Sequence, residues 1–167
     1  MFARGEAEVA SQPDPLAISG SDLYVLVASR YNDFITRELI EGVKAGLRSH
    51  GASEENVQLV RVPGAMEIPL AAKWLAETGK YNAIICLGSV IRGATTHYEV
   101  VVNACSAGVS QVALESGIPT IFGVLTTENI EQAIERSEMT LGNKGCEFAE
   151  TAIEMVNLKR SIGEVQP

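Results

Sequence analysis

The residues best suited to chemistry lie in the segment Gly93-Ala94-Thr95-Thr96-His97. Gly93, Ala94 and Thr95 precede a predicted helix, so they can present backbone N–H groups and a hydroxyl to an anion at the positive end of the helix dipole. His97 falls in the first turn of that helix, where the dipole disfavours the imidazolium, so the ring can remain neutral and accept a proton near neutral pH. The segment predicts a phosphate site beside a general base, with a purely structural hydrogen-bonding role for His97 as the alternative.

Three charged residues near the last predicted helix could extend this site. Lys144 and Glu147 lie close to one helical turn apart, so Lys144 could bind a phosphate and Glu147 could orient a histidine. Arg136 ends a short predicted helix, and its planar guanidinium could bind phosphate through two hydrogen bonds. For Lys144 and Glu147 the alternative is solvated surface charge, and for Arg136 it is an ordinary interaction with the end of its own helix.

Aromatic and cysteine residues narrow the chemistry further. Tyr31 directly follows the first predicted strand, where its ring could stack on a planar heterocycle, although an isolated aromatic residue more often packs against the protein itself. Cys86, Cys105 and Cys146 are odd in number and lack both C-x-x-C spacing and clustered histidines, so they predict neither a disulfide framework nor a zinc site. No Ser-His-Asp or Cys-His order indicates a protein nucleophile. A reducing cytosol fits these cysteines best.

Length and composition limit the class of protein. The chain has 167 residues, of which 46% are hydrophobic and 20% are charged, and this predicts a single well-packed domain rather than a disordered or disulfide-stapled chain. Its 13 basic and 21 acidic residues give a net charge of -8, the wrong sign for binding nucleic acid or an anionic membrane. No apolar run approaches the roughly 20 residues that span a bilayer. We therefore expect a soluble, cytoplasmic protein whose phosphate site is local.

Short apolar runs alternate with longer segments of helical periodicity. The runs predict four strands, at Leu23–Ala28, Val57–Val62, Ala83–Leu87 and Pro119–Leu125. The periodic segments predict five helices, at Asp33–His50, Met66–Thr78, Thr96–Ser116, Glu128–Arg136 and Lys144–Ser161. Thr127 is the candidate N-cap of the fourth helix. The order predicts an α/β fold, a flavodoxin-like three-layer sandwich in which helices cover both faces of a four-stranded parallel sheet.

The domain is expected to cover residues 21–163, between an N-terminal tail of residues 1–20 and a C-terminal tail of residues 164–167. The first tail has neither a signal-peptide nor a transit-peptide pattern. Its prolines favour an extended segment, which could pair with the sheet of a neighbouring subunit. Ligands of parallel α/β sheets bind outside the carboxyl ends of the strands, so the segments that follow the four strands should form the site.

Those segments resemble, in the same order, the lumazine synthase family of riboflavin biosynthesis. The resemblance is carried by six blocks: Ala28–Asn32, Val62–Pro69, Val90–Glu99, Phe122–Arg136, Gly142–Gly145 and Ala152–Met155. It spans most of the chain. It implies condensation of 5-amino-6-(D-ribitylamino)uracil with 3,4-dihydroxy-2-butanone 4-phosphate to 6,7-dimethyl-8-ribityllumazine, releasing phosphate and water, without a metal or an organic cofactor.

The resemblance also implies which residues contact the ribitylaminouracil. Tyr31 matches the family's aromatic residue that stacks on the pyrimidine. Ser89, Val90 and Ile91 match the segment whose backbone contacts the ring edges. The ribityl-binding loop corresponds to Ala65, Met66 and Glu67, and Asn32 and Gly64 complete the expected substrate-binding set.

The remaining positions are implied to serve the phosphorylated substrate and the proton transfers. The butanone phosphate is assigned to Gly93, Ala94, Thr95, Arg136 and Lys144. His97 matches the proton-transfer residue, and Glu147 the carboxylate that can orient it. Phe122 is implied to come from a neighbouring subunit, so the site would be completed at an interface. The implied partners are further copies of the chain, as a homopentamer or a 60-subunit shell of pentamers, and riboflavin synthase.

Two other hypotheses remain open at this point. The chain could be a non-catalytic relative that binds flavin-like ligands or forms a shell, or an unrelated flavodoxin-like sensor of a phosphorylated ligand. A shell by itself has no need of Arg92, His97, Arg136, Lys144 and Glu147, and this favours the enzyme.

Overall fold

The computed structural model describes residues 14–164 of the chain. Most of the predicted N-terminal tail therefore lies outside the described residues, and its pairing with a neighbouring subunit stays a prediction. Part of the remainder packs on the chain's own domain, because Leu16 and Ile18 contact the hydrophobic core. Asn157 also donates hydrogen bonds of 2.8 Å to the backbone oxygens of Pro15 and Ala17.

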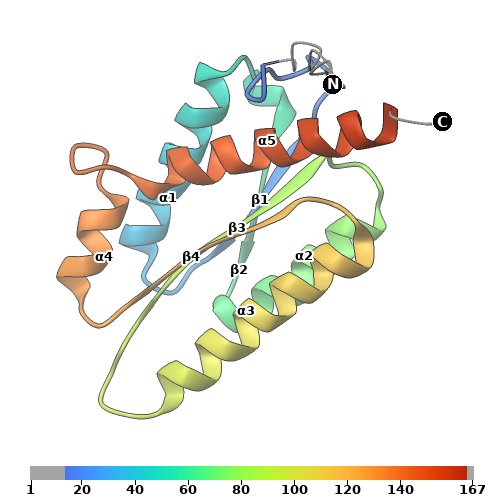
Figure 1. The fold of residues 1–167 in the computed structure, drawn as a ribbon. Coiled ribbons are helices and arrows are strands. Elements are labelled where there is room, and N and C mark those ends of the chain that lie inside the picture. Colours follow the sequence, from blue (N-terminus) through green and yellow to red (C-terminus); the bar gives the residue numbers. More distant parts are fainter. Residues whose placement is uncertain (1–13, 165–167) are drawn as a thin grey trace, which may run out of the picture.

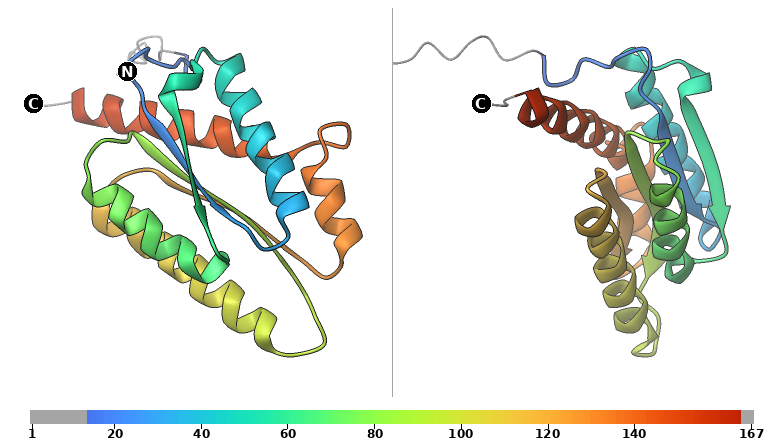
Figure 2. Two further views of the ribbon diagram at one scale, coloured as in Figure 1. Left: turned by 180° about the vertical axis from the view of Figure 1, so that it is seen from behind. Right: turned by 90° about the vertical axis from the view of Figure 1, so that its right-hand side faces the viewer.

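Four parallel strands form the central sheet, in the order β2-β1-β3-β4. The strands are β1 (Tyr24–Ser29), β2 (Val57–Val62), β3 (Ala83–Ile91) and β4 (Thr120–Thr127). The helices are α1 (Asp33–Ser49), α2 (Ile68–Glu77), α3 (His97–Ser116), α4 (Ile130–Ser137) and α5 (Lys144–Glu164). Figures 1 and 2 show α1, α4 and α5 on one face of the sheet and α2 and α3 on the other. The predicted three-layer α/β fold is confirmed.

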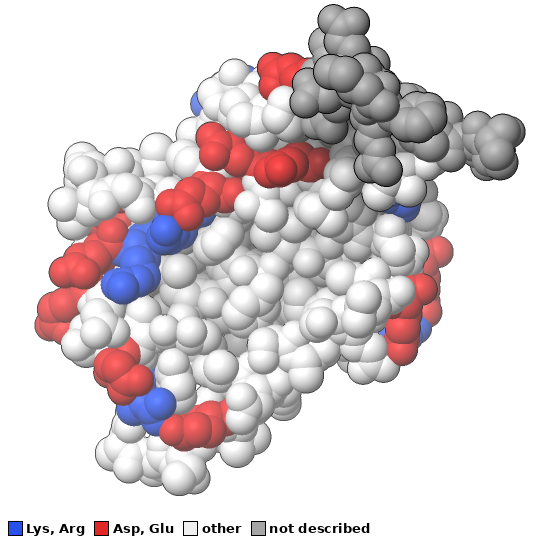
Figure 3. Space-filling model, in the orientation of Figure 1, with Lys and Arg blue, Asp and Glu red and all other residues white. Residues whose placement is uncertain are grey.

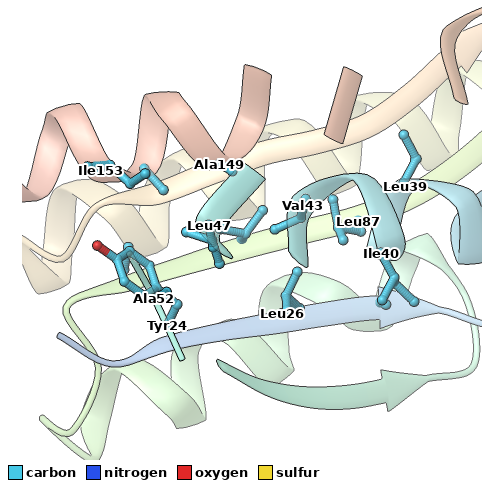
Figure 4. Packing of buried hydrophobic residues seen from close by; sticks show 14 of the residues in the cluster. Tyr24, Leu26, Leu39, Ile40, Val43, Leu47, Ala52, Leu87, Ala149 and Ile153 are labelled. Carbon is cyan, nitrogen blue, oxygen red and sulfur yellow. The ribbon is translucent and has the colours of Figure 1, made fainter. Parts of the chain in front are cut away.

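The core has two halves because neighbouring residues of a strand point to opposite faces of the sheet. Leu26 of β1 packs in the half under α1 and α5, whereas Val25 and Val27 pack in the half under α2 and α3. Figure 4 shows Leu47 of α1 in the first half, with Ile153 of α5 near it. Burial of one such aliphatic side chain contributes about 1.5–3 kcal/mol, so both layers hold the sheet firmly.

The boundaries of several elements differ from the predicted ones. β3 continues past Leu87 to Ile91 because its last residues pair with β4 as far as Thr127, and local sequence does not reveal such long-range pairing. Thr127 ends β4, and the N-cap of α4 is Asn129, whose side chain accepts a hydrogen bond of 2.9 Å from Gln132 N–H. The cap prediction at Thr127 was therefore wrong.

The helix predicted from Met66 is preceded by a separate turn. A short 3₁₀ turn, Ala65–Glu67, precedes α2, which begins at Ile68 with Pro69 in its first turn. Proline suits that position because it lacks an N–H that would have no helical partner there.

Figure 3 shows charged side chains along the rim of one face and an uncharged centre. Asp and Glu predominate over Lys and Arg there, in keeping with the net charge of -8. Among the described residues, no helix is both long and apolar enough to cross a membrane. The cytoplasmic location stays a prediction.

Candidate active site

A cavity of about 360 Å³ opens at the carboxyl end of the sheet. Its lining comes from the loops after β1 and β2, from the last residues of β3 and from the first turns of α3. It consists of Tyr31, Asn32, Ala65, Ser89, Val90, Ile91, His97 and Val101. Sequence analysis had selected all of these except Val101. Val101 lies four residues after His97, on the same side of α3, and that helical spacing is the signal that could have found it.

The ring of Tyr31 lies over Gly64 and is 73% exposed. A backbone hydrogen bond holds this loop against the loop after β2, because the Tyr31 N–H donates to Pro63 O at 3.2 Å. A Cβ atom placed on Gly64 would lie 2.8 Å from Cδ2 of Tyr31, so only glycine allows this approach. The result is an exposed aromatic face beside the cavity, suited to stacking on a flat ring.

Asn32 ties the loop after β1 to the end of β3. Its backbone is left-handed, with φ 53°, a conformation that asparagine tolerates better than most residues. The side-chain amide donates a hydrogen bond of 2.8 Å to Ser89 O, while the Asn32 carbonyl accepts from the N–H groups of Ile35 and Thr36 at the start of α1. Asn32 therefore fixes the cavity wall.

The loop after β2 is closed by its own glutamate. The carboxylate of Glu67 accepts a hydrogen bond of 2.9 Å from the Gly64 N–H. This turn buries Ala65 against the cavity and leaves Met66 exposed. Of the three residues assigned to the ribityl chain, Ala65 thus lines the cavity itself, and Met66 and Glu67 stand beside it in the same turn.

A hydroxyl group in the cavity wall has an unused hydrogen-bonding capacity. Ser89 is only 3% exposed, and its Oγ is buried without a hydrogen-bond partner among the described residues. A buried hydroxyl without a partner lowers stability by about 1–3 kcal/mol, so such groups need an explanation. Ser89 belongs to the cavity lining, although its Oγ itself is closed to solvent.

The segment 93–97 has the geometry that the sequence predicted. Gly93, Ala94 and Thr95 are exposed ahead of α3, and His97 is the first helical residue. The His97 N–H contacts Thr95 Oγ1 at 3.4 Å. The loop thus stands at the positive end of a long helix, where an anion is stabilised.

Arg92 anchors this loop to the rest of the sheet edge. Its guanidinium donates to the carboxylates of Glu99 and of Glu128, the latter at 2.7 Å, and lies 4.2 Å from the centre of the Tyr98 ring. The hydrogen bond from Arg92 holds the pKa of the Glu99 carboxyl below its usual range. The ion pair therefore persists at neutral pH, and sequence analysis had not assigned this anchoring role.

Ten predicted site residues are absent from the cavity lining. Six of them belong to the neighbouring turn and loop already described: Gly64, Met66, Glu67, Gly93, Ala94 and Thr95. The other four lie on β4, α4 and α5: Phe122, Arg136, Lys144 and Glu147. Phe122 is 36% exposed on β4, at the edge of the sheet. Arg136 donates to Gln132 O at 2.9 Å. Lys144 Nζ lies 2.8 Å from both carboxylate oxygens of Glu147. An interaction between Glu147 and His97 stays a prediction.

The cavity and the loop together can hold two different molecules side by side. The exposed tyrosine and the backbone of Ser89–Ile91 suit a planar polar heterocycle, and the helix N-terminus suits a phosphorylated compound. His97 lines the cavity and is also the first residue of α3, so it can move protons for a molecule bound at either place. Among the described residues, no group of three or more His, Cys, Asp or Glu side chains could hold a metal ion.

Known proteins of one family are similar to this chain over most of its length. A family model described as 6,7-dimethyl-8-ribityllumazine synthase matches residues 23–160. A protein of that name from Chlorobium luteolum is 54% identical over 147 residues, which are 87% of this chain and 95% of that protein. Another of that name, from Chlorobium phaeovibrioides, is 53% identical over 137 residues, covering 82% of this chain and 88% of that protein.

Proposed function

The chain belongs to the 6,7-dimethyl-8-ribityllumazine synthase family, and from this premise we propose how its residues divide the work of the reaction. The enzyme, a transferase, condenses 5-amino-6-(D-ribitylamino)uracil with 3,4-dihydroxy-2-butanone 4-phosphate in riboflavin biosynthesis. The observation that carries the proposal is the cavity at the carboxyl end of the sheet, which joins Tyr31, Ser89–Ile91 and His97 in one lining.

The ribitylaminouracil lies in this cavity. Its pyrimidine stacks on Tyr31 and bonds to the backbone of Ser89, Val90 and Ile91, with Asn32 holding the wall in place. The ribityl chain runs along the turn of residues 64–67. The cavity lining supports this placement, because it brings Tyr31 together with Ser89, Val90 and Ile91.

The butanone phosphate binds at the N-terminus of α3, on the backbone of Gly93, Ala94 and Thr95. Arg136 and Lys144 supply the positive charge, and charge-assisted hydrogen bonds to phosphate are about twice as strong as neutral ones. These two cations lie outside the cavity of their own chain, as does Phe122. We therefore assign all three, together with Glu147, to the site of a neighbouring subunit.

Positioning is the main contribution to catalysis. The substrate amine is itself a nucleophile toward the ketone, so the site has to hold two molecules in attack geometry, which can lower the barrier by about 7–11 kcal/mol in favourable cases. Imine formation, phosphate elimination and ring closure all move protons. His97 serves these transfers, and Glu147 orients it, an arrangement worth about 10²-fold to 10⁴-fold in rate.

Family membership brings with it the two small-molecule substrates and an oligomeric assembly. We propose a homopentamer as the unit that completes the site, able to build a 60-subunit shell and to associate with riboflavin synthase. Support comes from the exposed apolar groove between α3, β4 and α5, where Leu114 is 84% and Ile162 is 66% exposed. Exposed apolar residues gathered in this way are typical of surfaces that a partner covers.

Mixed oligomers test the shared site. Alone, His97→Ala should slow kcat about 100-fold, and Arg136→Ala should raise the KM for butanone phosphate at least about tenfold. Co-expressed in equal amounts, the two variants should regain roughly one quarter of wild-type activity at low butanone phosphate. In a randomly mixed ring, about one quarter of the interfaces join a subunit with an intact His97 to a neighbour with an intact Arg136.

The controls are co-expressions of two copies of the same variant, which should show no more activity than that variant expressed alone. Activity of the mixed oligomer equal to the average of the two single variants would place Arg136 in the same subunit's site. An unchanged KM in Arg136→Ala alone would remove that residue from the phosphate site altogether.

A further inference from the structure

Asn143 uses its buried side-chain amide to join three helices. The residue is 6% exposed. Its Nδ2 donates a hydrogen bond of 2.8 Å to Glu38 O in α1 and another to Ser137 O at the end of α4, while its Oδ1 accepts one of 2.6 Å from the Gly145 N–H at the start of α5. Both the donor and the acceptor of the amide are therefore satisfied by main chain.

Two glycines make this contact possible. A Cβ atom on Gly42 would lie 2.1 Å from Oδ1 of Asn143, and a Cβ on Gly145 would lie 2.5 Å from Leu39 O. Any side chain at either position would push α5 away from α1. The sequence thus provides space for the Asn143 amide at two sites that are far apart along the chain.

The bonds of Asn143 go beyond the capping of α5. A helix cap needs only an oxygen that accepts from the first turn, which Oδ1 supplies. The two bonds donated by Nδ2 lead instead to α1 and to Ser137. A capping role alone leaves these two bonds unexplained.

Asn143 lies at the base of the loop that separates the two proposed phosphate cations. Ser137 directly follows Arg136, and Lys144 directly follows Asn143. The residues between them, 138–142, are all exposed. The hydrogen bond from Asn143 to Ser137 O closes this loop, so it fixes the backbone next to Arg136 relative to the backbone next to Lys144.

We propose that Asn143 is a positioning residue for the phosphorylated substrate: its side chain sets the separation of Arg136 and Lys144 by bonding the main chain beside both. The proposal rests on the function assigned above to these two cations. Because two charged side chains bind one phosphate best at one spacing, loss of this bond should weaken phosphate binding and leave the ribitylaminouracil site alone.

The test compares Asn143→Asp with Asn157→Asp in the full-length protein. Aspartate keeps the shape of Asn143 and its acceptor for Gly145, but its second oxygen would face the carbonyls of Glu38 and Ser137 without a proton to donate. Asn157 is the matched control, because it lies on α5, the helix that Asn143 directly precedes, and its Nδ2 also donates to two main-chain oxygens, those of Pro15 and Ala17.

We expect Asn143→Asp to raise the KM for butanone phosphate about tenfold, and to weaken calorimetric binding of inorganic phosphate by a similar factor. The KM for ribitylaminouracil should stay within about twofold of the wild-type value. Asn157→Asp should leave all three quantities unchanged. If Asn143→Asp yields no folded oligomer, Asn143→Ser, which adds no charge, is measured in the same way.

A lowered Tm with unchanged phosphate affinity and an unchanged ratio of the two KM values would overturn the proposal and leave Asn143 a structural residue only. Arg136→Ala separates this failure from failure of the proposed function. If Arg136→Ala weakens phosphate binding and the Asn143 variants do not, the present inference alone is wrong. If Arg136→Ala has no effect, the assignment of the cation is wrong, and this inference falls with it.

Discussion

At the amino end of the sheet, Asp22 is 1% exposed and bound to Arg160, whereas at the carboxyl end Tyr31 is 73% exposed and His97 stands open to solvent. Asp22 also accepts a hydrogen bond of 3.0 Å from the Ser19 N–H. The chain thus pairs the Asp22 carboxylate within itself at one end and leaves Tyr31 and His97 exposed at the other. The difference indicates that the amino end contributes stability and the carboxyl end contributes binding.

The loops of the two ends are also held differently. Before β1, the Leu23 N–H donates to the Asn82 side chain at 2.8 Å, and the Asn82 N–H donates back to Leu23 O at 2.8 Å. Near the carboxyl ends of β1 and β3, Ser29 and Ser89 instead keep buried hydroxyls that lack a partner within residues 14–164. Among the described residues, the buried polar atoms without a partner belong to Tyr24, Ser29, Arg61 and Ser89, and of these residues only Ser89 lines the cavity.

The largest effect is expected from removing the buried charge at the amino end. Asp22→Ala leaves the Arg160 guanidinium and the Ser19 N–H without their partner, and we expect the free energy of unfolding to fall by about 2–3 kcal/mol. Both KM values should remain unchanged. Denaturant titration at a fixed protein concentration measures the loss, since oligomer stability depends on concentration.

Lys73→Ala is the control for Asp22→Ala, because it breaks the exposed pair of Lys73 and Glu77 and should change stability by less than about 0.5 kcal/mol. A similar small change in Asp22→Ala would show that the amino end does not carry the stability assigned to it.

A smaller effect, on binding rather than stability, is expected from Gly64→Ala at the carboxyl end. The new Cβ would lie 2.8 Å from Cδ2 of Tyr31, so the ring has to move. The backbone at Gly64 is extended, with φ -144°, and alanine adopts it without strain. We expect the KM for ribitylaminouracil to rise about fivefold to tenfold, with Tm nearly unchanged.

Steady-state kinetics with both substrates measure this change, and Gly20→Ala serves as the control because nothing lies within 4 Å of a Cβ there. An unchanged KM for ribitylaminouracil in Gly64→Ala would mean that the position of the Tyr31 ring does not matter for the substrate.

These two regions also differ in how far the sequence could predict them. Apolar runs located all four strands and helical periodicity located five helices, because both patterns are local. The same patterns placed Tyr31 and His97 at strand ends, where the topology of a parallel sheet then brought them to one edge. The extension of β3 to Ile91 depends on pairing with β4, and local sequence carries no sign of it.

Long-range contacts account for the residues that sequence reasoning missed. Asn143 stands in a recognisable block, but its hydrogen bond to Glu38 O joins positions 105 residues apart. Asp22 likewise gains its role from Arg160, which lies 138 residues later. In the proposed site, Arg136, Lys144 and Phe122 act across a subunit interface, and the sequence pattern of one chain does not reveal such contacts.

The smallest effect is expected at alkaline pH, again at the amino end. Burial, reinforced by the nearby charge of Asp22 and only partly offset by Arg160, raises the pKa of Tyr24 to about 12. The pKa of an unfolded tyrosine is about 10, so the folded state holds this proton more tightly. The stability that follows from this difference is fully present below pH 10 and is lost as the pH rises toward 12.

Tyr24→Phe removes this titration together with a hydroxyl that is buried without a partner in the described part of the chain. At neutral pH the variant should be as stable as the wild type or slightly more stable, because no hydrogen bond is lost. Near pH 11 the variant should be the more stable protein by about 1 kcal/mol. At that pH, Tyr24 of the wild type is ionised mainly in the unfolded chain, and this favours unfolding. Denaturant titrations of both proteins at several alkaline pH values measure the gap. Parallel curves through this range would show that Tyr24 ionises as readily in the folded protein as in the unfolded chain, and that the amino end is as open to water as the carboxyl end.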